Sequence, residues 1–332
     1  MDNLCHTLVG LGLAESGLKR KTALGTATLL VGANLPDLDV LAYLWGPVTA
    51  LGFRRGWTHG VLALALWPLI LAGLMLAWDR WVRRRREPGA APADTRWLVG
   101  LAAIAVTSHP LLDFLNTYGV RFLMPFNGRW YYGDTLFIVD QWVWLALGAG
   151  AAWSHRRWDA GRPRAARPAR VSLVLVVVYI ALMGAGTVIA RRMVWREAQS
   201  AFPGARRLMA APVPLLPTVR GVTVELPGEY RYGELRWFGR RGLGGGSDHR
   251  RREIIEWNDS DVFRKNDMLP EAMDASRTPE ARAFLRWARF PAYSVEPQRD
   301  SALVRIWDAR YPGQGWAEVA IKVGRPLSFV VP

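Results

Sequence analysis

Cysteine is almost absent from this chain of 332 residues, and Cys5 is its single copy. An internal disulfide is therefore excluded, and cysteine usage does not indicate the redox compartment. We expect Cys5 to be a small buried residue. The chain also has no basic residue before its first apolar stretch, which argues against a cleaved signal peptide, so we expect Met1 to remain in the mature protein.

Acidic residues are few compared with basic ones, and 28 against 43 leave a net charge of +15. Such a charge can indicate nucleic-acid binding. The arginines, however, gather between apolar segments, at residues 80–86 and 156–170, where the topology of a membrane protein places them. We therefore expect no nucleic-acid partner.

Long apolar runs, in contrast, fill most of the first 190 residues. Each of four runs has about the 20 residues that cross a hydrocarbon core, which is about 30 Å thick. Tryptophans flank their ends, as expected at bilayer interfaces. The expected spans are residues 60–78, 97–115, 136–153 and 171–190.

A helical hairpin is predicted before these spans. Residues 4–18 and 22–36 are apolar stretches of similar length, joined by a basic turn at residues 19–21. At about 1.5 Å per residue each arm rises about 21 to 24 Å, so His6 and Asp37 should meet at one level. We therefore expect an all-α polytopic membrane domain, residues 1–192, with about five to six membrane helices including the hairpin.

The loop-charge rule places the two arginine-rich loops in the cytoplasm. The loop at residues 116–135 and everything after residue 190 then lie on the other side. Arg191 and Arg192, directly after the last span, count mildly against this orientation. We expect a multi-pass inner-membrane protein with an extracytoplasmic C-terminal domain.

Residues 193–332 predict a smaller, soluble α+β domain. Residues 222–226 alternate apolar and polar side chains, and residues 303–306 and 319–323 are also typical of strands. These strands set the C-terminal part apart from the helical membrane domain.

Two local signals complete the C-terminal part. Thr278 is a candidate helix cap followed by Pro279 at the first helical position, and the helix should run to about Arg289. The glycine-rich residues 242–247 predict a flexible loop, because they lack the Lys-Ser/Thr ending of a phosphate-binding P-loop.

Three of the five histidines, and three aspartates, lie at the ends of the apolar segments. Ionisable side chains there are costly and usually functional. Neutral imidazole and carboxylate are also the ligands that zinc and similar ions prefer. The candidate metal ligands are His6, Asp37, Asp39, His59, His109 and Asp113. The topology drawn from arginine counts puts all six at one depth on one membrane face.

His109 and Asp113 are four residues apart, which on a helix puts their β-carbons about 5 to 6 Å apart on one face. Both can then reach one metal. The alternative is that His109 binds a backbone carbonyl ahead of Pro110 and that Asp113 caps a helix end. For this pair alone, both interpretations stay open.

Asp37 and Asp39 follow Pro36 in a predicted turn that points both carboxylates into one pocket. They can supply a metal ligand and a general base, or bridge two metals. The alternative is a solvated loop, which the apolar sequence around them disfavours because unpaired carboxylates are expensive there.

Arg54 and Arg55 shortly precede His59 and complete the candidate catalytic residues, together with the two aspartates of the turn. As permanently charged planar groups they can clamp a phosphate. They can equally be ordinary interface anchors. Thr58 would fix the local turn or donate to a bound anion, and we assign no role to His155 and His249.

These motifs resemble those of the YdjM-like family of inner-membrane metal-dependent hydrolases. The shared elements are H-T-L-x-G at 6–10, N-x-P-D-x-D at 34–39, R-G-x-T-H at 55–59, H-x-x-x-D at 109–113 and N-T-Y-G at 116–119. The resemblance covers about residues 1–155. It implies a metal site and, less directly, hydrolysis.

The order of the ligands is more distantly similar to that of zinc-dependent phospholipase C and the P1-type nucleases. Both have His, Asp, His and His-x-x-x-Asp, and about 50 residues separate His59 from His109 here as there. The similarity implies phosphodiester hydrolysis, in which one of the two early aspartates binds metal and helps to deprotonate water. Those enzymes add further histidines and a glutamate, whereas only Asp134 and Asp140 follow here, so we expect one or two ions.

The sequence thus predicts a membrane-bound metal-dependent hydrolase of a phosphate ester, such as a phospholipid or a lipid-linked phosphodiester. A divalent ion, zinc or a similar one, would activate water. A site at headgroup depth favours a lipid substrate. One rival is a cation or proton transporter, although transport sites tend to lie near the midplane. Another is a membrane-anchored binding domain, which would not need the ionisable clusters.

Overall fold

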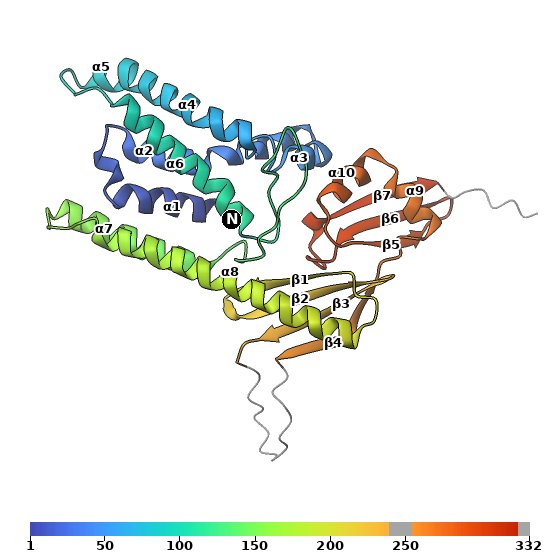
Figure 1. Cartoon of the computed structure of the whole chain (residues 1–332). Coiled ribbons are helices and arrows are strands. Elements are labelled where there is room, and N and C mark those ends of the chain that lie inside the picture. The colour runs from blue at the N-terminus through green and yellow to red at the C-terminus, as the bar shows by residue number, and fades with distance from the viewer. Residues whose placement is uncertain (239–253, 325–332) are drawn as a thin grey trace, which may run out of the picture. The chain divides into compact units, whose positions relative to one another are not determined.

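The computed structural model describes residues 1–238 and 254–324. The predicted loop at 242–247 and His249 lie outside the described residues. The chain divides into two compact units, each considered by itself (Figure 1). The helical unit comprises Met1–Leu44, Phe53–Thr187 and Val213–Pro217, and the strand-rich unit comprises Trp45–Gly52, Val188–Pro212 and Thr218–Pro332. The domain boundary at residue 192 stays a prediction.

The predicted N-terminal hairpin is present in the helical unit. Helix α1 (Asn3–Glu15) and helix α2 (Gly25–Asn34) are joined through the short 3-10 helix η1 (Leu18–Arg20). The turn predicted around the two aspartates was wrong, because the chain continues as a 3-10 helix, η2 (Leu35–Trp45). Pro36 suits this conformation, since proline is tolerated in the first turn of a helix, where its missing N–H is not needed.

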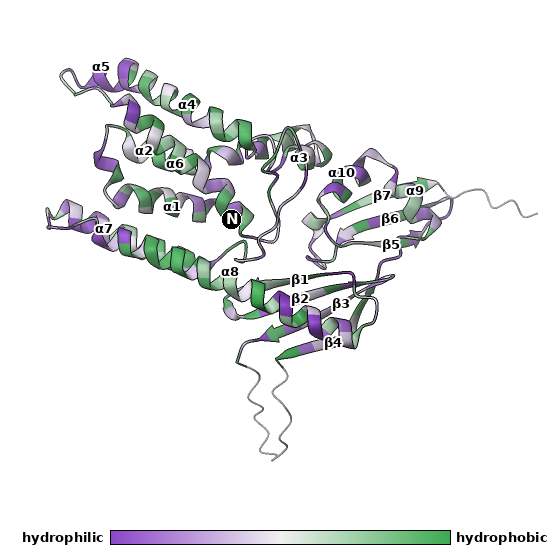
Figure 2. Cartoon of the chain, viewed as in Figure 1, coloured by the Kyte–Doolittle hydropathy of each residue, from purple (hydrophilic) through white to green (hydrophobic). Residues whose placement is uncertain are grey.

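The short helix α3 (Pro47–Phe53) follows, most of it in the strand-rich unit. The next elements form an apolar hairpin with a basic connection. They are α4 (Val61–Trp78), the π-helical turn η3 (Asp79–Arg83), α5 (Arg84–Arg86) and α6 (Thr95–Phe114). Figure 2 shows hydrophobic residues along most of α4 and hydrophilic ones at α5. This contrast is expected where a membrane helix ends in a basic loop.

Four described helical segments are long and apolar enough to span a bilayer: Gly25–Trp45, Val61–Arg86, Thr95–Phe114 and Arg167–Ala201. The last is helix α8. Helix α7 (Gln141–Asp159), which covers most of the predicted span at 136–153, does not qualify because His155, Arg156 and Arg157 make its last turns polar. The count of five to six membrane helices stays a prediction.

Small residues bring α2 close to both of its neighbours. A β-carbon on Gly10 of α1 would lie 2.8 Å from the carbonyl oxygen of Leu29. One on Gly32 of α2 would lie 2.9 Å from the β-carbon of Ala105 in α6 and 3.2 Å from Leu71 in α4. Membrane helices associate through such close backbone approach. The packing brings the ends of α1, α2 and α6 together, and these ends carry the candidate ligands.

The strand-rich unit contains a four-stranded sheet with the order β1-β2-β3-β4. Its strands are β1 (Arg207–Val213), β2 (Leu216–Leu226), β3 (Glu229–Arg236) and β4 (Ile255–Arg264). Strand β3 pairs antiparallel with both β2 and β4. The alternation at 222–226 correctly predicted the second strand, since Val222 and Val224 pack in the core of this unit.

A second sheet, with the order β5-β6-β7, is antiparallel throughout. Its strands are β5 (Pro291–Pro297), β6 (Ser301–Asp308) and β7 (Glu318–Gly324), and η4 (Gly315–Ala317) precedes the last. Two helices, α9 (Pro270–Ser276) and α10 (Pro279–Trp287), come before the sheet. The predicted helix cap is confirmed, because the Thr278 hydroxyl accepts a hydrogen bond from the Ala281 backbone N–H at 3.2 Å.

The α2 packing gives a stability prediction. Gly32→Leu should lower the free energy of unfolding by about 1–3 kcal/mol or more, because the added side chain overpacks a contact that has no room for a β-carbon. Gly100→Leu in α6 is the matched control, since a β-carbon at that position would have no neighbouring atom within 4 Å. Thermal unfolding in detergent, followed by size-exclusion chromatography, measures the difference. Equal midpoints for the two variants would contradict the packing argument.

Candidate metal centre

Three of the sequence motifs meet in the helical unit. Asp37 from η2, His59 from the loop before α4, and His109 and Asp113 from α6 each offer one ligand atom, and these atoms all lie within 4.8 Å of one another. The two histidines and Asp113 are buried, whereas Asp37 is partly exposed. The predicted spacing of four residues does place His109 and Asp113 on one helix face.

The separations between these atoms suit a tetrahedral ion. His59 Nε2 lies 3.2 Å from Asp113 Oδ2, and His109 Nε2 lies 3.6 Å from the same oxygen. His109 Nε2 is also 3.6 Å from Asp37 Oδ1. Ligands bound tetrahedrally at about 2.0–2.2 Å from zinc are about 3.4 Å from one another. The four residues therefore fit a metal ion with little rearrangement.

A backbone contact fixes the orientation of His109. Its Nδ1 lies 2.6 Å from the carbonyl oxygen of Ala33 in α2. A carbonyl only accepts hydrogen bonds, so Nδ1 donates, and in the neutral imidazole it is then Nε2 that offers a lone pair. The alternative considered for His109, a hydrogen bond to a backbone carbonyl, is therefore present at Nδ1. The other nitrogen, Nε2, still faces Asp37 and Asp113.

His59 is held in a similar way from the side opposite the ligand cluster. Its Nδ1 lies 2.9 Å from the Thr58 hydroxyl and 3.6 Å from Asp39 Oδ2. Burial lowers the pKa of His59, and the nearby Asp113 acts in the opposite direction without restoring it. The ring is therefore neutral near pH 7, which is the form that binds a metal.

Two predicted ligands lie at the edge of the four-residue cluster. His6 Nε2 is 3.4 Å from Asp113 Oδ1, and the His6 ring stacks on His109 with 3.6 Å between ring centres. Asp39 is buried and accepts a 2.7 Å hydrogen bond from the Arg55 backbone N–H. Asp39 thus supports the His59 loop, while His6 approaches the second oxygen of Asp113, which also contacts the Met1 amino group.

The two predicted arginines lie in different surroundings. Arg55 is buried, with Nε 3.0 Å from Asp113 Oδ2 and with Nη1 donating to Asn116 Oδ1 at 3.1 Å and to the Gly119 carbonyl at 3.2 Å. Arg54 keeps 20% of its side chain exposed, and its Nε lies 3.7 Å from Asp39 Oδ1. Only Arg54 is placed to meet a molecule that arrives from outside.

The loop after α6 contributes residues that the sequence did not single out as functional. The buried Asn116 accepts hydrogen bonds from Arg55 and from the Tyr118 backbone N–H, and the Arg55 guanidinium lies 4.6 Å from the Tyr118 ring centre. Gly119 has a φ of +90°, and a β-carbon there would lie 2.6 Å from Tyr132. The N-T-Y-G motif was the sequence feature that could have indicated these residues. In the structure they hold Arg55 beside Asp113.

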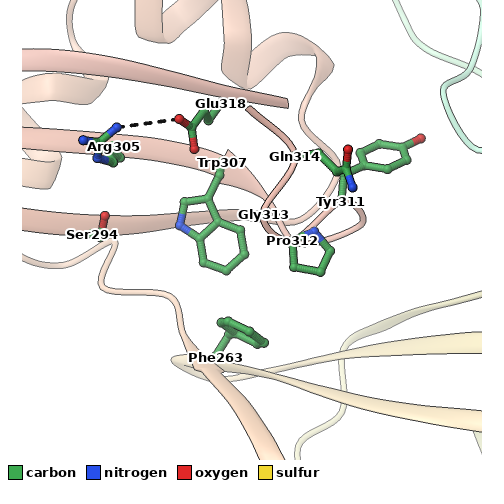
Figure 3. A pocket seen from close by; sticks show the side chains of 9 residues that line it. All are labelled: Phe263, Ser294, Arg305, Trp307, Tyr311, Pro312, Gly313, Gln314 and Glu318. Atoms are coloured by element: carbon green, nitrogen blue, oxygen red, sulfur yellow. Dashed lines mark ion pairs between the residues drawn. The ribbon is translucent and has the colours of Figure 1, made fainter. Parts of the chain in front are cut away.

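A separate pocket of about 250 Å³ lies within the strand-rich unit. Figure 3 shows the aromatic rings of Phe263 and Trp307 beside it, and the Arg305–Glu318 ion pair, with 3.7 Å between its atoms, at one edge. None of the predicted site residues lines this pocket. Among the described residues, the group of side chains that could hold a metal ion lies in the helical unit.

Comparison with known proteins supports the membrane assignment. Residues 1–191 match the YdjM inner membrane protein family. The chain belongs to this family. The match covers every residue of the candidate centre, and with the four apolar helices it identifies a membrane protein.

A curated relative extends the comparison without assigning an activity. The uncharacterized protein YfhP of Bacillus subtilis (strain 168) is 23% identical over 193 residues, which are 55% of this chain and 52% of YfhP. The chain thus spans about half the length of this relative. No solved structure matches significantly. The more distant similarity to zinc phospholipase C and P1-type nucleases stays a prediction.

The geometry predicts the metal content of variants. His59→Ala and His109→Ala should each lose most of the divalent metal bound to detergent-purified protein, because each removes one of the two imidazole nitrogens of the four-residue cluster. His155→Ala is the control, since that histidine is exposed and pairs with Glu15 and Asp159 instead. Inductively coupled plasma mass spectrometry gives the occupancy. Full occupancy in both ligand variants would remove the proposed centre.

Proposed function

We propose that this YdjM-family protein is a membrane-bound, metal-dependent hydrolase of a phosphate ester carried by a lipid. One observation supports this above all: several buried nitrogen and oxygen atoms converge without making a hydrogen bond among the described residues. They are His6 Nε2, His59 Nε2 and His109 Nε2, which all face the Asp113 carboxylate, and Asp113 Oδ2, whose contact with Arg55 is an ion pair. Each unsatisfied buried polar atom costs about 1–3 kcal/mol, so the cluster calls for an ion.

Asp37, His59, His109 and Asp113 would hold this ion, and His6 would extend the site toward a second one. Two imidazoles and two carboxylates are a donor set that suits zinc or a similar divalent metal. Such an ion supplies a nucleophile from water at neutral pH and polarises a phosphoryl oxygen. The remaining steps fall to side chains of the chain itself.

Asp37 is the residue best placed to handle a proton. Its side chain is 12% exposed, whereas the side chain of its neighbour His109 is fully buried. In the proposed reaction the water oxygen bonds to phosphorus, the ester P–O bond breaks, and the alcohol leaves with a proton. Asp37 would accept the proton of the attacking water, as a general base must do from hydrogen-bond distance.

The two arginines would divide their tasks. Arg54, partly exposed beside Asp39, would neutralise the phosphate during attack. Arg55 is committed to Asp113, Asn116 and Gly119, and would position the Asp113 carboxylate rather than contact the substrate. This division refines the expectation that both arginines act on phosphate.

A lipid substrate follows from the position of the centre along the helices. Asp37 lies in the second half of the apolar segment Gly25–Trp45, and His109 and Asp113 lie near the end of Thr95–Phe114. The apolar segments around the centre suit a lipid substrate better than a water-soluble one.

The chemistry can be tested through Asp37. Asp37→Asn should lower turnover of a phospholipid or lipid-linked phosphate by about 10²–10⁴-fold, because it removes the proton acceptor. Metal occupancy should fall less than turnover, since the asparagine side chain keeps one oxygen that can bind a metal but cannot accept the proton as a carboxylate does. Release of phosphorylated headgroup or inorganic phosphate from mixed micelles is the readout, with chelated enzyme as the blank. No product from a broad lipid panel, together with a cation flux in liposomes that depends on His109, would replace the hydrolase with a transporter.

The sidedness of the centre forms a further part of the proposal. We expect cysteines at Glu87 and Arg162, in the two arginine-rich loops, to resist a membrane-impermeant thiol reagent in intact cells. A cysteine at Arg299, in the strand-rich unit, should react. Cys5→Ser provides the background, and permeabilised cells provide the control for exposure. The reverse labelling would place the strand-rich unit and the metal centre in the cytoplasm.

A further inference from the structure

The 3-10 helix η2 sorts its residues into rows, because at three residues per turn side chains three apart lie over one another. The buried row consists of Pro36, Asp39 and Ala42. A different row, here called the leucine row, consists of Leu38, Leu41 and Leu44, with exposed fractions of 45%, 52% and 79%. One helix therefore presents Asp39 to the protein and an unbroken line of leucines to its surroundings.

The leucine row borders the open side of the metal centre. Asp37, the ligand with an exposed portion, heads the third row of η2, which continues with the exposed Val40 and Tyr43. Neighbouring rows of a 3-10 helix are about 120° apart, so Asp37 and Leu38 lie on adjoining rows. A molecule that reaches the metal centre past Asp37 therefore passes apolar side chains of η2.

The charge pattern indicates what covers this surface. No charged residue occurs between Asp39 and Arg54. Surfaces that face water, or the rim of a protein interface, carry polar and charged side chains. The row also belongs to the candidate membrane span Gly25–Trp45. Helix α4, which begins just after His59, exposes Leu62, Leu66 and Leu69 in the same manner.

We propose that the leucine row lies in the bilayer hydrocarbon and binds the hydrocarbon chain of the lipid whose phosphate enters the metal centre. The row is about 12 Å long at about 2.0 Å per residue, so it contacts a chain over several carbon atoms. The phosphate at the end of that chain meets Arg54, whose side chain remains partly exposed beside Asp39. The identity of the substrate rests on the proposed function, but the contact with hydrocarbon does not.

Fluorescence quenching by brominated lipids tests the contact directly. Leu38→Cys, Leu41→Cys and Leu44→Cys, each in a Cys5→Ser background, are labelled with a small fluorophore and reconstituted into phosphatidylcholine vesicles with brominated or unbrominated acyl chains. Quenching should match that of Leu66→Cys, an exposed position on α4. A label at Arg299→Cys in the strand-rich unit should not respond. Absence of quenching along the leucine row, with Leu66→Cys quenched, would show that the row does not contact hydrocarbon and overturn the proposal.

Kinetics test the link to the metal centre. Leu41→Ser should lower kcat/KM for a long-chain phospholipid by about tenfold, because burial of the leucine side chain against hydrocarbon is lost. It should leave hydrolysis of the soluble ester bis(p-nitrophenyl) phosphate unchanged. Leu74→Ser, an equally apolar and exposed site about 22 Å along α4 from His59, is the matched control.

Quenching and kinetics together distinguish a failure of the proposed function from a failure of the leucine-row proposal. If wild type hydrolyses neither ester, the proposed function fails, and quenching still decides whether the leucine row contacts lipid. If Leu41→Ser lowers both activities equally, or if Leu74→Ser has the same effect on the phospholipid, the row does not bind the substrate chain.

Discussion

The helical unit is organised around one fully buried carboxylate, that of Asp113. Its two oxygens face His6 from α1, Arg55 and His59 from the loop before α4, and His109 from the same helix. Removing an ionised carboxylate from water costs several kcal/mol, and its ion pairs with buried partners offset this cost only in part. A cluster of this kind is therefore poor evidence for stability. The cluster supports instead the metal site proposed above.

Helix packing and site chemistry depend on the same contact. Gly32 lets α2 approach α6, and the next residue, Ala33, uses its carbonyl to fix the His109 ring. A wider spacing between these helices would lengthen that 2.6 Å hydrogen bond and free the ring to rotate. The small residues of the hairpin thus determine which nitrogen of His109 faces the ligand cluster. Stability and metal geometry cannot be varied independently at this position.

Much of the arrangement was predictable from sequence because its signals are local. The hairpin follows from two apolar stretches around a basic turn, and the spacing of His109 and Asp113 follows from helix geometry. The 3-10 conformation of η2 was not predictable, since apolar periodicity there does not separate three from 3.6 residues per turn. The different surroundings of Arg54 and Arg55 were not predicted either, because the sequence does not indicate which way each of two adjacent arginines faces. The hydrogen bond from His109 to the Ala33 carbonyl was also not predictable, since every residue has a backbone carbonyl.

The conformation of η2 also limits how this segment can evolve. With a three-residue repeat, inserting one residue between Asp39 and Leu41 would put Leu41 in the buried place of Ala42, and deleting one residue there would put Tyr43 in that place. Exchange of one apolar residue for another leaves the rows intact. Relatives that keep the same centre should therefore tolerate many apolar substitutions here but conserve the length of the segment.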